Sequence, residues 1–410
     1  MPADETTSQA IRLSRVRIER MKKSPLRMLA AVCIVAVGFC YLGAMYAIAM
    51  RGKKPGLEGD YIGYWAAGQQ LIRHADPYDP GALLRIETAA GFDRVAPSIT
   101  PSPPVTFLLL LPLGLIDAWT GLILWGMAMM AALAASLWML WSLSGRPNTL
   151  LPLLGFCFAP AWVCMFGGQI GLFFLVSVTA FFYFIERGPL VAGVVLLPCV
   201  MKPHLFLTLG VVLLLWILDR RAWRVLGGFM LALGVSTAVT LYLDPHVFTH
   251  YAQSVRATDV VNRVTPTLPV LLRHTLAPGA AWLEFLPAVL SCVWGVWFYA
   301  RHRAHWSWLH EGLLVLLVAR LCAPYAWFSD EAIILPAVMI ALLHARKRHG
   351  VLWLSAAIAA VELAQVFKRM DMKNYAYAWT APAWLAWYLY ATRDSVAAPE
   401  ETRGAVSLAD

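Results

Sequence analysis

The sequence predicts an all-α, polytopic membrane protein with about 12 transmembrane helices, each able to cross a hydrocarbon core of roughly 30 Å. Composition is the first observation. Of the 410 residues, 60% are hydrophobic and 14% are charged, whereas a soluble domain carries about 25% charged residues. The mean hydropathy is +0.63. The second observation is that the apolar residues form runs of about 15–25 residues, whereas the strands of a membrane barrel would alternate.

The distribution of basic residues predicts which ends of the helices face the cytoplasm. Many basic residues precede the first apolar run or lie in short connections, as the positive-inside rule predicts for cytoplasmic segments. Orientation signals therefore explain the net charge of +9, and no nucleic-acid partner is expected. The basic residues before the first run are Arg12, Arg15, Arg17, Arg20, Lys22, Lys23 and Arg27.

The apolar pattern divides the chain into a cytoplasmic basic segment, one transmembrane domain and a disordered cytoplasmic tail, at 1–27, 28–392 and 393–410. The first helix covers about 28–50. Ala47-Ile48-Ala49 resembles a signal-peptide cleavage site. The apolar run is longer than the core of a typical signal peptide, which favours an uncleaved anchor. Two long connections, 51–102 and 244–280, are then expected on the outer side.

One part of the predicted topology requires an exception. Three apolar segments, 103–116, 118–142 and 149–165, separate residues 100 and 169, which are both expected outside. An even number of segments must cross between them. The segment 103–116 is the shortest, so we expect it to be a half-crossing or hairpin element.

The first outer connection is predicted to contain two short amphipathic helices. Tyr61, Trp65, Gly68 and Ile72 repeat at helical spacing, a stripe suited to lying on the bilayer surface. Asp79-Pro80 has the residue types of an N-cap followed by the first helical position, and the second helix should end near Gly91.

Asp60 is the most informative residue of this connection. It lies in Gly59-Asp60-Tyr61-Ile62-Gly63-Tyr64-Trp65, directly after the first helix, among aromatic residues that favour headgroup depth. A carboxylate there could be a general base that takes a proton from an attacking hydroxyl. An Asp before a helix is also a good N-cap, and both interpretations remain open. Asp76 and Asp79 have the pattern of turn and cap residues.

Several ionisable residues interrupt later apolar segments, where such residues usually face a functional cavity. Lys202 and His204 flank Pro203, Arg320 lies near the outer end of 308–323, and Asp330 opens the next segment. Converging outer turns would bring Lys202, His204 and Arg320 into a cationic pocket for a phosphate. The alternative is a structural ion pair between Arg320 and Asp330.

Other candidates carry weaker signals. Gln169 follows two glycines at another outer turn, and Arg273 lies on an outer segment where a headgroup-contacting helix explains it equally well. Sugar stacking is considered only for Tyr64, Trp65 and Trp327, since most aromatic residues lie near predicted helix ends. The first connection has no D-x-D cluster and no cysteines form a C-x-x-C, so no metal and no cofactor are expected.

The ordered set of these motifs resembles glycosyltransferase family 87 of the GT-C superfamily, whose members are polyprenol-phosphate-mannose-dependent mannosyltransferase-like membrane proteins. The matching pieces are Asp60-Tyr61 with Tyr64-Trp65-Ala66-Ala67, Asp76-Pro77-Tyr78, Ser102-Pro103-Pro104, Gly168-Gln169, Lys202-Pro203-His204, and Tyr325 with Asp330. The chain departs from the family pattern at Val264-Thr265-Pro266-Thr267, where an Asn/Gln-Ser motif is usual.

The resemblance implies a GT-C-type fold and an inverting sugar transfer. Asp60 would be the catalytic base, and Lys202, with His204 and Arg320, would receive the phosphate of a polyprenyl-phosphate leaving group. Substrate contacts are expected from Tyr64, Trp65, Gln169, Tyr325, Asp330 and Arg273.

The implied partners are a polyprenyl-phosphate-linked sugar (mannose or a similar hexose or pentose), a lipid or glycan acceptor, and membrane lipids. The expected location is the bacterial inner membrane, with the site facing the periplasm or cell exterior. A transporter or lipid flippase is the rival interpretation. It predicts matched broken helices in two halves of the chain, but the acidic, aromatic connection occurs once.

Overall fold

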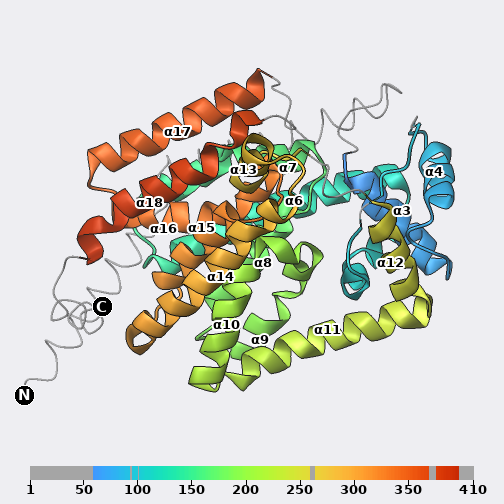
Figure 1. Ribbon diagram of the computed structural model, residues 1–410, viewed down its shortest axis with the longest axis horizontal. Coiled ribbons are helices and arrows are strands. Elements are labelled where there is room, and N and C mark those ends of the chain that lie inside the picture. The colour runs from blue at the N-terminus through green and yellow to red at the C-terminus, as the bar shows by residue number, and fades with distance from the viewer. Residues whose placement is uncertain (1–58, 93–94, 100, 259–263, 369–374, 397–410) are drawn as a thin grey trace, which may run out of the picture. The chain divides into compact units, whose positions relative to one another are not determined.

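The computed structural model describes residues 59–92, 95–99, 101–258, 264–368 and 375–396. These ranges all fall within one compact unit of the chain, residues 54–410. Every regular element in them is a helix (Figure 1), which agrees with the predicted all-α class. The predicted basic segment 1–27 and first helix 28–50 lie outside the described residues, as does most of the tail.

Four helices in the described ranges are long and apolar enough to cross a membrane. They are α6 (Ala118–Leu143), α11 (Trp223–Leu243), α14 (Trp282–His302) and α17 (His349–Phe367). The chain is therefore a membrane protein. The predicted number of about 12 spans is not confirmed, because several of the expected segments are shorter or interrupted helices.

Prolines mark many of these interruptions. The segment 103–116 is a 3-10 helix, η1 (Pro104–Leu109), followed by the short α5 (Leu111–Gly114). The segment 149–165 is divided into η2 (Leu151–Cys157) and α7 (Ala159–Phe166). Proline lacks the amide hydrogen that a helix interior requires and is tolerated in the first turn. Each of these four elements accordingly has a proline at one of its first two positions.

The expected helix pair 189–218 is divided in the same way. Its elements are α9 (Pro189–Val194), η3 (Leu197–Met201), η4 (Pro203–Leu205) and α10 (Leu207–Arg220). Lys202 lies between the two 3-10 helices with φ −131° and ψ 69°. This non-helical backbone directs the chain, and with it the lysine, out of the helical path.

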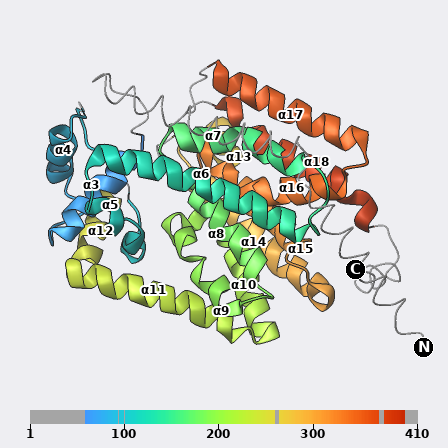
Figure 2. The same cartoon turned by 180° about the vertical axis from the view of Figure 1, so that it is seen from behind.

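The first long connection contains the two predicted helices, but one prediction about them is wrong. α3 (Tyr61–Ile72) is buried from Tyr61 to Leu71 on all its faces, so it does not lie on the bilayer through one apolar stripe. The reason is a close approach to α5: a Cβ atom added at Gly68 would lie 2.7 Å from the carbonyl oxygen of Leu110. Figure 2 shows α5 beside α3, with α6 running past both.

The second helix, α4 (Pro80–Ala89), begins as predicted. The Asp79 side chain accepts hydrogen bonds from the backbone N–H groups of Gly81 and Ala82, and Pro80 occupies the first helical position. The helix ends at Ala89, and its C-cap Ala90 precedes Gly91, whose φ is +90°. This helix start is encoded locally, since all its determinants lie within four residues.

Six of the described elements pack against α8 (Gly171–Phe184), most of which is buried. α8 contacts α6, α7 and the 3-10 helix η6 (Phe328–Ile334). α17 and α18 lie side by side in both views (Figures 1 and 2). The other helices are α12 (Val247–Ala257), α13 (Leu268–Leu276), α15 (Glu311–Leu321), α16 (Leu335–His344) and α18 (Thr380–Val396), with short 3-10 turns η5 (Arg303–His305) and η7 (Tyr375–Tyr377).

Candidate active site

Asp60 is held at the start of α3 by the glycine-rich turn that precedes α8. Its backbone N–H donates a hydrogen bond to the carbonyl oxygen of Gly167 at 3.1 Å. Gly59 has a φ of +33°, and a Cβ atom there would lie 1.8 Å from the same oxygen. Only glycine fits such a contact. Two motifs that are far apart in the sequence, Gly59-Asp60 and Gly167-Gly168-Gln169, therefore meet in the structure.

The Asp60 side chain does not cap α3. The residue occupies the N-cap position with helical φ and ψ of −79° and −18°, and its carboxylate accepts no hydrogen bond from the first turn. The charge of Asp60 instead acts on Lys202 and on Tyr64. Of the two interpretations left open by the sequence, the structure thus disfavours the cap.

Lys202 reaches from the η3–η4 junction to Asp330 in η6. Its ammonium nitrogen lies 2.8 Å from Oδ1 of Asp330, and the two side chains are 19% and 1% exposed. The other carboxylate oxygen, Oδ2, accepts the backbone N–H of Trp327 at 2.9 Å. Burial opposes the charge on Asp330, but Lys202, the Trp327 N–H and Arg320 together outweigh it and lower the pKa of the carboxyl group. Asp330 is therefore an ionised anchor that orients Lys202.

The ion pair of Arg320 differs from the one considered in the sequence. Arg320 lies 3.0 Å from Oε1 of Glu331, not against Asp330, and also donates to the carbonyl oxygen of Trp327 at 3.2 Å. Its side chain is 2% exposed. Thr380 donates a hydrogen bond of 2.7 Å to the same glutamate oxygen. Arg320 therefore ties α15 to η6, and its partner Glu331 ties η6 to α18.

His204 is close to this cluster but is not a cation in it. Its ring lies 3.9 Å from the ring of Tyr325, centroid to centroid. Burial, followed by the charge of Lys202, lowers the pKa of His204 to about 3. The expected pocket of three cations is therefore wrong in this respect: the imidazole is neutral near pH 7, and it offers hydrogen bonds rather than charge.

Tyr64 and Trp65 form a buried wall behind Asp60. They are 2% and 6% exposed. The Trp65 indole donates to the carbonyl oxygen of Ile116 at 2.9 Å, and the Tyr64 ring lies 5.7 Å from that of Trp125. These contacts give the two aromatic residues a packing role in the described structure.

Two residues that the sequence analysis did not select connect the site. Trp125 of α6 donates a hydrogen bond of 3.1 Å to the carbonyl oxygen of Gly168. Cys164 of α7 donates to the carbonyl oxygen of Ser329 at 3.1 Å. A tryptophan within a long apolar helix, away from the interfacial positions that tryptophans favour, was a usable signal for Trp125. The sequence offered none for Cys164.

Gln169 and Arg273 have different positions. Gln169 lies on the turn that holds Asp60, and its Oε1 atom is buried with no hydrogen-bond partner among the described residues. Arg273 forms a buried ion pair of 2.6 Å with Glu284 and donates to the carbonyl oxygen of Pro278. These bonds fasten α13 to α14, so we interpret Arg273 as a structural residue.

Four apolar helices of spanning length and a cluster of buried acids and cations define a membrane protein with charged groups in its interior as the class of protein. The model of glycosyltransferase family 87 matches residues 102–329, which is more than half of the chain. The chain belongs to this family and is a membrane glycosyltransferase. Neither the search of curated proteins nor the search of solved structures returned a match.

The matched range includes part of the candidate site. Gln169, Lys202, His204, Arg320 and Tyr325 lie within residues 102–329. Asp60 precedes the range and Asp330 immediately follows it. Family membership therefore does not establish the role of Asp60, which depends on the geometry around it.

Proposed function

We propose that this enzyme transfers a sugar, mannose or a similar hexose or pentose, from a polyprenyl-phosphate donor to a hydroxyl group of a lipid-linked or glycan acceptor. Asp60 is the general base and the anomeric centre inverts. The supporting observation is that Asp60 lies near enough to Lys202, whose side chain is 19% exposed, for its charge to act on the ammonium group. A base and a phosphate-binding cation would thus belong to one site.

The proposed step is a single displacement. Asp60 takes the proton of the acceptor hydroxyl as its oxygen attacks the anomeric carbon. The bond from that carbon to the phosphate oxygen breaks, and its electron pair stays with the departing polyprenyl phosphate. Attack from the face opposite the leaving group inverts the centre. The leaving group thereby gains one negative charge.

Lys202 stabilises that charge as it develops. An ammonium group has three N–H donors, and Asp330 receives one of them at 2.8 Å. The other donors of Lys202 can bind phosphate oxygens. Preorganised charge that acts on the transition state is commonly worth a factor of about 10²–10³ in rate. Asp330 keeps the lysine in place during the reaction.

The surrounding residues have supporting roles in this proposal. Neutral His204 donates a ring N–H to the phosphate, and the buried guanidinium of Arg320 adds positive charge from beneath. Tyr325 and Gln169 contact the sugar or acceptor, while Tyr64 and Trp65 form the wall that positions Asp60. No metal or other cofactor takes part in the chemistry, because lysine supplies the charge that a metal would supply.

The proposed location is the inner membrane of a bacterium, with the site on the periplasmic or exterior side. A lipid-phosphate donor can reach such a site by diffusing in the bilayer. Membership of a glycosyltransferase family favours this function over the transporter or flippase interpretation.

A donor panel tests the proposal. Purified enzyme is incubated with polyprenyl-phosphate sugars and with the corresponding nucleotide sugars, with and without a chelator. We expect transfer from a polyprenyl-phosphate sugar only, at the same rate with chelator present. Transfer from a nucleotide sugar, or loss of transfer when a chelator removes catalytic metal from an enzyme that remains folded, would refute the proposed donor or chemistry.

A further inference from the structure

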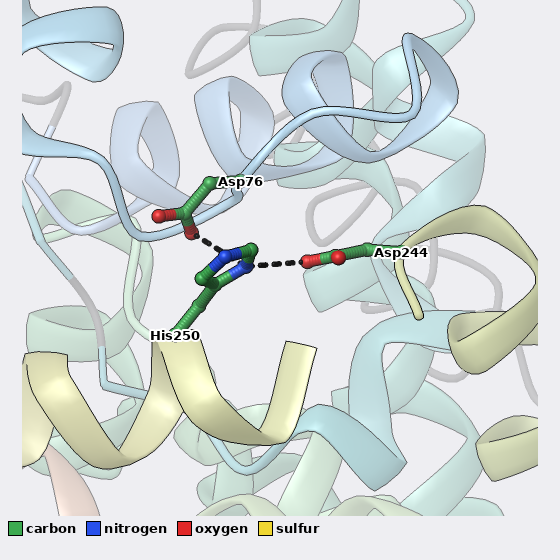
Figure 3. A group of neighbouring side chains, drawn as sticks. All are labelled: Asp76, Asp244 and His250. Carbon is green, nitrogen blue, oxygen red and sulfur yellow. Dashed lines mark hydrogen bonds and ion pairs between the residues drawn. The ribbon is translucent and has the colours of Figure 1, made fainter. Parts of the chain in front are cut away.

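Asp76, Asp244 and His250 converge from three separate segments at the other end of α3 from Asp60. Asp76 follows α3, Asp244 directly follows α11, and His250 lies on α12. Figure 3 shows the imidazole of His250 between the two carboxylates. The His250 Nδ1 atom is 2.8 Å from Oδ2 of Asp244 and 3.6 Å from Oδ1 of Asp76. One ligand atom from each residue lies within 4.8 Å of the others.

The backbone holds these groups in place. Oδ1 of Asp76 accepts the N–H of Tyr78 at 2.8 Å, and Oδ1 of Asp244 accepts the N–H of His246 at 2.9 Å. His74, in the same connection as Asp76, bonds through Nδ1 to the carbonyl oxygen of Leu243 at 2.9 Å. The three side chains are therefore arranged before any ligand arrives, which reduces the entropy that binding must overcome.

The contacts of His250 do not satisfy both carboxylates. Its Nδ1 atom is within hydrogen-bonding distance of Asp244, but the 3.6 Å separation from Asp76 exceeds that distance. Within the part of the chain that the structure describes, both carboxylates form their ion pairs with His250 alone. The two carboxylates carry two negative charges, and a divalent cation among the three converging ligand atoms would balance both of them.

We propose that Asp76, Asp244 and His250 bind a divalent transition-metal ion such as Zn²⁺. Zinc accepts carboxylate oxygen and imidazole nitrogen as ligands, and three protein ligands leave a fourth position for water. Mg²⁺ and Ca²⁺ prefer oxygen ligands alone, so the histidine disfavours them. The His250 and Asp76 side chains are 25% and 30% exposed, which gives the ion a path from water.

Three protein ligands with an open position are common at catalytic zinc sites, but this cluster is far from Asp60, so the ion would have a structural role here. α3 has 12 residues, which corresponds to about 18 Å along the helix axis, and the cluster and Asp60 lie beyond its opposite ends. The ion would fasten the connection that carries Asp60 to the α11–α12 turn of the second long connection. In both ribbon views α12 lies beside α3 (Figures 1 and 2). No metal was expected from the sequence, because the acids considered were those of the first connection only. Two of the three proposed ligands, Asp244 and His250, lie in the second.

Zinc binding by the purified, chelator-stripped enzyme tests the proposal. Metal content and thermal unfolding are measured during titration with zinc, magnesium or calcium. We expect one equivalent of zinc and a saturable rise in Tm, with neither effect from magnesium or calcium. His250→Gln and Asp244→Asn should each weaken zinc binding by more than about tenfold, because a ligand contributes at least as much as the residues that orient it.

Two control variants change residues near the cluster that are not proposed ligands. His246→Gln changes another imidazole of the α11–α12 turn, and Asp79→Asn changes a nearby acid while retaining a good N-cap. Both should bind zinc as the wild type does. Equal zinc binding by His250→Gln, or no zinc bound by the wild type, would overturn the proposal and identify an ion triad only. Should the ligand variants fail to fold, Co²⁺ added to the wild type decides: a spectrum identical to that of aqueous Co²⁺ would likewise overturn it.

Discussion

Replacing Lys202 and Asp330 separately and together distinguishes a catalytic lysine from a structural one. Lys202→Met leaves the carboxylate of Asp330 charged, 1% exposed and without its ammonium partner. Removing one partner of a buried ion pair costs about 3–5 kcal/mol. We therefore expect Lys202→Met to lower the free energy of unfolding by that amount. Asp330→Asn alone should also destabilise, because it leaves the ammonium group without its counter-ion.

The double variant Lys202→Met/Asp330→Asn removes both charges. Asparagine can still accept the N–H of Trp327 through its side-chain oxygen, a bond that Asp330 makes at 2.9 Å. Stability should therefore recover most of the 3–5 kcal/mol. Sugar transfer should not recover, because no ammonium remains to stabilise the leaving phosphate, and the expected loss is about 10²–10³-fold.

Thermal unfolding and a transfer assay with a polyprenyl-phosphate sugar give the two readouts. The buried pair Arg273–Glu284, with a distance of 2.6 Å, is the matched control. Arg273→Met should destabilise the protein, and Arg273→Met/Glu284→Gln should recover both stability and activity. Recovery of transfer in Lys202→Met/Asp330→Asn would refute the phosphate-binding role and leave Lys202 as a structural residue only.

Three further predictions follow from local geometry. His204 has a folded pKa of about 3, below the unfolded value of roughly 6.5. The contribution of His204 to the free energy of unfolding is present above about pH 6.5 and is lost as the pH falls towards 3, by up to about 1.4 kcal/mol per pH unit. In His204→Gln, the free energy of unfolding should lack this dependence on pH. Gly59→Ala should reduce activity strongly, because its Cβ atom would lie 1.8 Å from the Gly167 oxygen. The control Gly91→Ala meets no atom within 4 Å and should keep its activity while losing only about 1 kcal/mol of stability. Equal activity in the two variants would contradict this prediction. Asp79→Ala should destabilise by about 1 kcal/mol and Asp79→Asn by much less, so equal thermal shifts would refute the cap.

Local features of the fold followed from the sequence, and long-range ones did not. The start of α4 was predicted, since Asp79 and Pro80 act on the turn that they begin. The surface position of α3 was wrong because its spacing of apolar residues does not reveal that α5 packs against Gly68. The span count is not confirmed, because prolines end helices that composition alone joins into longer segments.

The site shows the same division. The sequence selected the residues that meet around Lys202, but it paired Arg320 with Asp330, whereas the guanidinium binds Glu331. These acids are adjacent on a 3-10 helix, and the sequence does not reveal which of them faces α15. Likewise, the acids of the first connection gave no sign that Asp76 would meet His250 of the second.

Single-turnover sugar transfer by Asp60→Asn, with donor affinity measured separately, decides whether Asp60 is the general base. Asparagine keeps the size of the side chain and can bind an acceptor hydroxyl, but it cannot take its proton. We expect wild-type stability, unchanged donor affinity and a transfer rate lowered by about 10²–10⁴-fold. A rate within tenfold of the wild type would show that another group deprotonates the acceptor and that Asp60 is not the base.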